Sequence, residues 1–79
     1  IKRLSDIENI ATSFTGVNKA YAIQAGREIR VIVQPDIVDD AGIVKLSHEI
    51  KQKLEDQLSY PGQITITVIR EVRAVDIAK

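Results

Sequence analysis

The 79-residue sequence contains no cysteine, which excludes a fold held by disulfides and any metal site or nucleophile built on a thiolate. No apolar run approaches the roughly 18 residues of a membrane-spanning helix, and no signal peptide is visible. Neither sign of charge is in excess, since eleven basic residues balance eleven acidic ones. A general polyanion binder needs a surplus of Lys and Arg on one face, so the chain does not belong to that class.

Aromatic residues are also scarce, because Phe14, Tyr21 and Tyr60 are the only ones, and they offer only a thin platform for stacking bases. The apolar content of 44% and the charged content of 28% are typical of one small globular domain. The first residue is Ile rather than Met. We therefore expect the chain to be a piece of a longer protein.

The first predicted element is a helix from Asp6 to Thr15. Ser5 and Glu8 fit a capping box, in which each side chain satisfies a free backbone N–H at the helix start. Gly16 is placed to end the helix. Apolar residues repeat at intervals of three and four and form one stripe: Leu4, Ile7, Ile10, Ala11 and Phe14.

The stretch YAIQAGREIRVIVQP, Tyr21–Pro35, predicts a β-hairpin. One strand covers Ala20–Gln24, and the second alternates apolar and polar residues from Ile29 until Pro35 ends it. Gly26 in the loop supplies the positive φ that hairpins need. The alternation indicates that one face of the hairpin is covered.

A second helix is predicted from Asp40 or Ala41 to Ser59, capped by Asp39 or Asp40. Its buried stripe comprises Ile43, Leu46, Ile50, Leu54 and Leu58. A turn at 60–62 leads into a third strand, Gln63–Arg70. The tail, Glu71–Lys79, either extends that strand or forms a short helix.

The resulting order is α-β-β-α-β, an α+β fold. We expect a two-layer sandwich in which both helices cover one face of a three-stranded sheet, with the first strand central. The other face stays open and carries Arg30, Ile32, Gln34, Thr65, Thr67 and Ile69. A contiguous exposed patch of this kind indicates an interface. The alternative is the ordinary Thr-rich outer face of a two-layer domain.

Residues for catalysis or metal binding are few. His48 is the only histidine and should be exposed. Asp36, Asp39 and Asp40 do not match a calcium-binding loop and are better explained by helix capping. No Ser-His pair and no phosphate-binding loop is present. We therefore expect no catalytic residue, metal site or cofactor in this chain.

Four arginines carry the remaining hypothesis of binding. Arg27 and Arg30 lie on the hairpin, and Arg70 and Arg73 lie near the end of the third strand. If those ends meet, the guanidinium groups could form an RNA-contacting patch. The acidic residues among them could instead form ion pairs with them: Glu28, Glu71 and Asp76.

Two segments, Tyr21–Pro35 and YPGQITITVIREVRAVDIAK at 60–79, closely resemble the extreme C-terminal segment of ribonuclease Y. That family comprises bacterial, membrane-anchored endoribonucleases that initiate mRNA decay. The similarity covers nearly the whole chain. In the second helix, the pattern of residue types matches better than the residue identities do. It implies a parent protein at the cytoplasmic face of the membrane.

The resemblance also implies that the parent has a membrane helix, a coiled coil, an RNA-binding KH domain and a metal-dependent HD domain, all absent from this chain. His48 is followed by Glu49 rather than Asp, and no Gly-x-x-Gly loop is present. No catalytic or metal residue is therefore carried over, and a divalent metal is implied only for the parent HD domain. Residues 1–79 become a single accessory C-terminal domain.

Three functions follow as hypotheses. The first is self-association, or docking to the HD domain or another partner, through the open sheet face. The second is an auxiliary RNA-binding module that uses the four arginines. The third is a small-molecule regulatory domain of the ferredoxin-like type, although those folds begin with a strand that Ile1–Leu4 is too short to supply.

Overall fold

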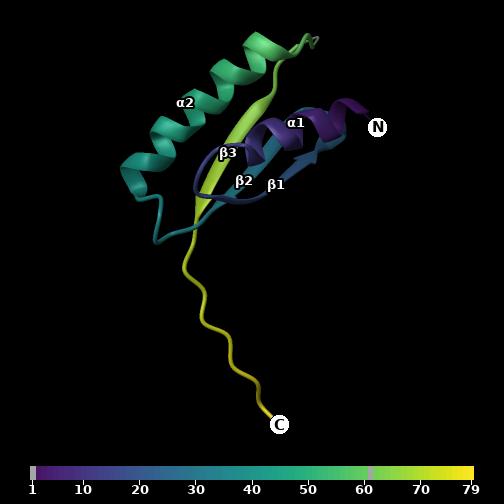
Figure 1. Cartoon of the computed structure of the whole chain (residues 1–79). Helices are drawn as coiled ribbons and strands as arrows, with labels where there is room; N and C mark the ends of the chain where they lie inside the picture. The colour runs from purple at the N-terminus through teal and green to yellow at the C-terminus, as the bar shows by residue number, and fades with distance from the viewer. Residues whose placement is uncertain (1, 61) are drawn as a thin grey trace.

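The computed structural model describes residues 2–60 and 62–79, and its elements follow the predicted order (Figure 1). The turn expected at 60–62 includes Pro61, which lies outside the described residues. The elements are α1 (Lys2–Thr12), β1 (Val17–Ile23), the short 3-10 helix η1 (Gln24–Gly26), β2 (Glu28–Val33), α2 (Asp40–Gln57) and β3 (Thr65–Arg70).

The three strands form one mixed sheet in the order β1-β2-β3. β1 runs antiparallel to β2, and β3 runs parallel to β2. The expectation that the first strand is central was wrong, because β2 occupies that place. The reason is visible in its burial: Ile29, Val31 and Val33 are at most 1% exposed, so β2 is the strand that both helices must cover.

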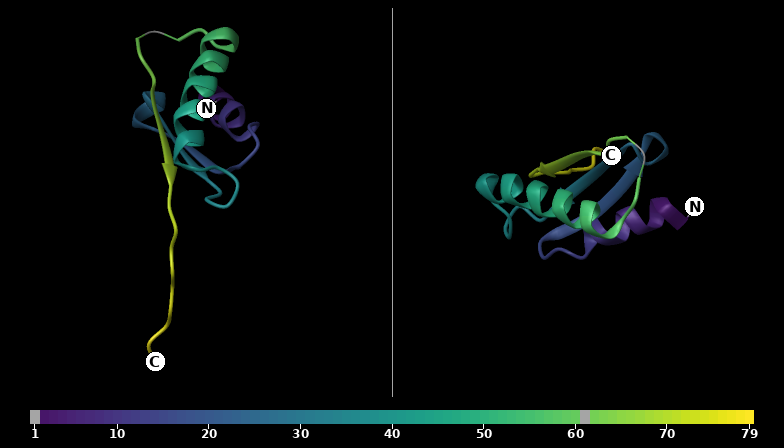
Figure 2. Two further views of the ribbon diagram at one scale, coloured as in Figure 1. Left: turned by 90° about the vertical axis from the view of Figure 1, so that its left-hand side faces the viewer. Right: turned by 90° about the horizontal axis from the view of Figure 1, so that it is seen from above.

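Both helices pack on one face of the sheet, as the α+β sandwich prediction required (Figure 2). Ile7 and Ile10 of α1 join Leu46, Ile50 and Leu54 of α2 in a single apolar cluster against β2. Fully burying a side chain of this size stabilises the fold by about 1.5–3 kcal/mol. This one cluster is therefore the main source of stability.

The two predicted helix caps had opposite outcomes. Asp39 caps α2, since its Oδ1 accepts the N–H of Gly42 at 2.7 Å. The capping box at Ser5 was wrong, because α1 already begins at Lys2 and encloses Ser5. Glu8 Oε2 instead accepts the backbone N–H of Ala22 at 2.9 Å and joins α1 to β1.

Gly16 does not end the first helix, which stops earlier, at Thr12. It serves the connection to β1, with a φ of +91°. A Cβ at this position would lie 2.5 Å from Cγ2 of Val38, a distance that real Cβ atoms essentially never show. Its carbonyl accepts the N–H of Gln34 at 2.8 Å. Glycine is required here by the close approach of two loops.

The tail, residues 71–79, leaves the body as an extended chain (Figure 1). It neither forms a helix nor pairs as a continuation of β3. Val72, Val75 and Ile77 are 82%, 80% and 76% exposed. Among the described helices, none has the length and apolar character needed to cross a bilayer.

Candidate assembly surface

The face of the sheet opposite the helices is uncovered by any described element (Figure 2). The strand register arranges its residues in rows. Lys19, Ile32 and Ile69 form one row. Tyr21, Arg30 and Thr67 form the next. We call this surface, defined by those two rows together with Glu28 and Thr65, the open face.

One end of the open face is polar and held by hydrogen bonds. Glu28 Oε2 accepts from Arg30 Nε at 3.1 Å and from Thr67 Oγ1 at 3.0 Å. The Arg30 hydrogen bond, followed by that of Thr67, lowers the pKa of the Glu28 carboxyl below its ordinary value. The Glu28 side chain is only 14% exposed, so this network is partly shielded from water.

The other end of the open face is apolar. Ile32 and Ile69 lie directly opposite each other on neighbouring strands and are both half-buried, while Tyr21 is 45% exposed. Four of the residues named from the sequence thus share this face within adjacent rows. Thr65 begins β3 on the same face, and Gln34 follows the end of β2. The structure therefore brings the predicted interface residues together, whereas their role as an interface stays a prediction.

The four arginines are not brought together. β2 and β3 are parallel, so Arg27 lies beside the start of β3, where its carbonyl accepts the N–H of Thr65. Arg70 pairs in register with Val33 at the opposite end of the strands. Arg30 lies on the open face, whereas Arg70 alternates onto the helix-covered face. The condition for a shared patch, that the strand ends meet, is therefore not fulfilled.

Arg70 and Arg73 have local partners. Arg70 donates from Nε to the carbonyl of Val38 and from Nη2 to that of Pro35, both at 2.7 Å, and its Nη1 lies 3.7 Å from Asp40. Arg73 Nη2 pairs with Glu71 at 2.6 Å. Arg70 therefore fixes the connection between β2 and α2. No pattern in the sequence indicated these carbonyl contacts. The sequence indicated that Glu28 and Glu71 could pair with the arginines, and the structure pairs them with Arg30 and Arg73.

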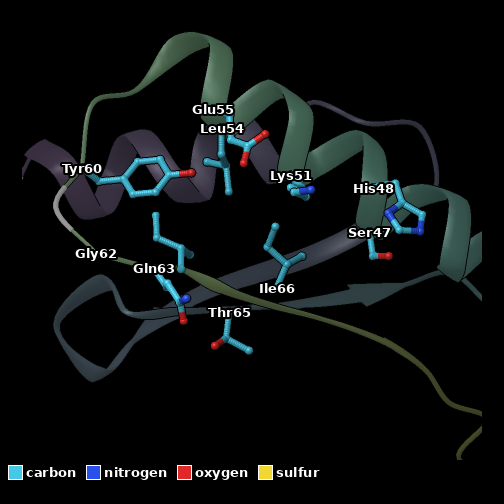
Figure 3. A pocket seen from close by; sticks show the side chains of 11 residues that line it. Ser47, His48, Lys51, Leu54, Glu55, Tyr60, Gly62, Gln63, Thr65 and Ile66 are labelled. Atoms are coloured by element: carbon cyan, nitrogen blue, oxygen red, sulfur yellow. The ribbon is translucent and has the colours of Figure 1, made fainter.

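Two pockets lie between α2 and the chain that leads into and forms β3. The first is lined by His48, Lys51 and Glu55 of α2 together with Tyr60 and Ile66 (Figure 3). The second is lined by Ile43, Val44 and Ser47 of α2 and by residues of β3. His48 is exposed, as the sequence predicted. Within residues 2–60 and 62–79, no three His, Asp or Glu side chains gather in an arrangement that could hold a metal ion.

Comparison with known proteins shows that the chain matches a segment of longer proteins. It is 65% identical over all 79 residues to ribonuclease Y of Clostridium perfringens, and 60% identical to those of Roseiflexus sp. and Streptococcus pyogenes serotype M5. The chain spans 16% of the first of these proteins and 15% of the other two. No family model and no solved structure matches it. The chain is therefore homologous, over its full length, to a segment of ribonuclease Y.

Proposed function

We propose that this chain is an accessory C-terminal domain of a ribonuclease Y-type endoribonuclease and that it mediates self-association of the parent through the open face. The homology over all 79 residues supports the relation to the parent. The observation that carries the assembly role is the pairing of Ile32 with Ile69 on a sheet face that no described helix covers. Excluding water from apolar area on an uncovered face, by contact with a second surface, lowers the free energy of association.

RNA hydrolysis and the divalent metal of the family belong, in this proposal, to the parts of the parent that the chain does not span. The same holds for the anchor at the inner face of the membrane. The accessory domain supplies contacts between copies and takes no part in the chemistry. Its fixed polar end, built on Glu28, Arg30 and Thr67, gives the surface one orientation, because buried polar groups must find matching partners across an interface.

Substitution on the open face tests this role. Ile32→Glu and Ile69→Arg should each weaken self-association by at least tenfold, because each buries a charge in the contact. Ile37→Glu is the matched control, since Ile37 is 54% exposed in the connection between β2 and α2. Circular dichroism verifies that each variant is folded, and sedimentation velocity gives the dissociation constant.

If Ile32→Glu and Ile69→Arg associate as tightly as Ile37→Glu, the open face is not the assembly surface. A wild-type chain that never associates would also overturn the proposal. In that case docking of the same face on the HD domain is the next arrangement to test. RNA contact by the arginines is tested separately, by titration at low salt, where phosphate binding is strongest.

A further inference from the structure

The two edges of the sheet differ in how they are protected. β1 is one edge, and Glu8 from α1 occupies the N–H of Ala22 there. β3 is the other edge, and no described strand lies beyond it. An edge strand with free N–H and C=O groups is a template for pairing with another chain. β3 is therefore an edge that can accept a strand.

The groups that β3 directs outward follow from its pairing with β2. Thr65 donates its N–H to the carbonyl of Arg27 at 2.8 Å, so the odd-numbered residues of β3 face β2. In a parallel pair, the alternate residues direct both backbone groups away from the partner. Ile66, Val68 and Arg70 accordingly present their backbone to the free side.

The tail has the character of a strand that lacks a partner. Residues 71–79 continue the direction of β3 as extended chain, free of the body (Figure 1). Val72, Val75 and Ile77 are strand-forming residues that are each at least 76% exposed. Extended chain gains little stability on its own, because its backbone hydrogen bonds come only from a neighbouring strand. The tail and the free edge of β3 thus complement each other.

We propose that β3 and the tail of one copy pair antiparallel with the tail and β3 of a second copy, about a two-fold axis at Val72. This inference rests on the proposed self-association and specifies how it begins. In a symmetric antiparallel ribbon, residues that face each other must lie on the same side of the sheet. The axis must therefore lie midway between the two copies of one residue, which face each other. Each choice of that residue gives a distinct register.

Charge selects Val72 among the neighbouring registers. An axis at Arg70 or at Arg73 sets two arginines directly opposite each other, and an axis at Glu71 sets two glutamates opposite each other. An axis at Val72 instead places Glu71 opposite Arg73 of the second copy, on both sides of the axis. Opposite charges across a strand pair stabilise it and like charges destabilise it. Each Glu71–Arg73 pair within one copy, now 2.6 Å apart, is then supplemented by a pair between copies.

The same register matches the apolar residues. Ile69 lies opposite Val75 of the second copy, and Thr67 lies opposite Ile77. The even-numbered residues form the backbone hydrogen bonds between the two copies. The pairs of Ile69 with Val75 and of Thr67 with Ile77 are therefore non-hydrogen-bonded pairs, in which the side chains approach most closely. On the helix side, Val68 faces Asp76 of the second copy, which is then diagonal to Arg70. The partner tail therefore extends the sheet beyond Ile69 and Thr67 and adds Val75 and Ile77 to the open face.

A charge exchange tests the register in the 79-residue chain. Glu71→Arg and Arg73→Glu should each raise the dimer dissociation constant at least tenfold, because each sets like charges opposite each other. The double variant E71R/R73E restores opposite pairing and should return the constant to within about threefold of the wild type. Dimer formation that is equal in all four proteins would overturn the register.

Disulfide cross-linking provides a second measurement. The chain has no native cysteine, so only the introduced thiols can form the bond. Val72→Cys places the two thiols face to face at the axis, within the range that a disulfide spans. It should form a covalent dimer under mild oxidation. Val75→Cys is equally exposed but faces Ile69, so it should cross-link at least tenfold more slowly. Equal rates would contradict an axis at Val72.

Removal of residues 71–79 separates this inference from the proposed function. Loss of the dimer in the truncated chain supports pairing through the tail. A truncated chain that still dimerises, and is then dissociated by Ile32→Glu, would overturn the tail pairing while the open face kept its assembly role. A dimer lost on truncation but unaffected by Ile32→Glu would support the tail pairing and contradict the open-face contact.

Discussion

Glu8 Oε2 accepts the backbone N–H of Ala22 at 2.9 Å, and this contact joins the first helix to the outer edge of β1. The carboxylate occupies a donor that an edge strand would otherwise present to another chain. It also explains why α1 lies over β1 although β2 carries the most deeply buried residues. One side chain thus occupies a backbone donor on one edge of the sheet, whereas no described strand lies beyond the other edge.

Replacing Glu8 tests its structural role. Glu8→Ala should lower the free energy of unfolding by about 1–2 kcal/mol, because it removes a charge-assisted hydrogen bond from a partly buried N–H. Glu8→Gln keeps an acceptor oxygen and should lose less than half as much. Urea unfolding of the three proteins gives the comparison. Equal stability of Glu8→Ala and wild type would show that the contact contributes nothing.

Gly16 and Gly62 form a matched pair for backbone strain. Both have positive φ, +91° and +79°, but a Cβ at Gly16 would collide with Val38 whereas nothing lies within 4 Å at Gly62. Gly62→Ala should therefore cost only the left-handed conformation, about 1 kcal/mol. Gly16→Ala should cost at least about 1 kcal/mol more, through displacement of the loop. Thermal unfolding measures both, and equal losses would contradict the assigned close approach.

The Glu28 network predicts a pH dependence of stability. Hydrogen bonds from Arg30 and Thr67 lower the pKa of Glu28 in the folded state. The folded protein therefore binds the proton less readily than the unfolded chain does. The resulting stability is fully present above the unfolded pKa, about 4.3, and is lost as pH falls through the folded pKa.

Glu28→Gln lacks this ionisation and provides the comparison. The difference in urea midpoint between wild type and Glu28→Gln should stay constant near neutral pH and shrink as the solution is acidified below about pH 4.3. A difference that does not change with pH would show that Arg30 and Thr67 do not favour the carboxylate. Far-UV circular dichroism at each pH verifies that both proteins start from the folded state.

The amphipathic pattern predicted the core and the fold class. Ile7 and Ile50 are completely buried, as their helical spacing indicated, and the alternation at Ile29 and Val31 identified the covered side of β2. Asp39, one of the two residues predicted to cap the second helix, is the cap. These features depend on residues close together in the chain, where periodicity and capping chemistry are informative.

Features that depend on contacts distant in the sequence were not predictable in the same way. Ser5 and Glu8 have the spacing of a capping box, but the Glu8 carboxylate accepts the backbone N–H of Ala22 instead. The central place of β2 depends on both helices covering that strand. No local pattern in the sequence indicates which strand the helices cover. The parallel pairing of β2 with β3 separated Arg27 from Arg70, which sequence distance alone could not show.

The tail illustrates the same limit. Val72, Val75 and Ile77 have strand propensity, yet no strand forms there in a single copy, because a ladder needs a second backbone. Only the sheet topology shows that β3 is an edge, and so where a partner strand could lie. The pattern of charge and apolar residues around Val72 becomes informative once that edge is known.

The absolute mass of the 79-residue chain, measured by light scattering across a wide range of concentration, shows whether the chain self-associates. We expect the mass to rise with concentration to at least twice that of one chain, because the antiparallel ribbon pairs two copies. A mass that stays at that of one chain at every concentration would contradict self-association through the open face and the tail alike.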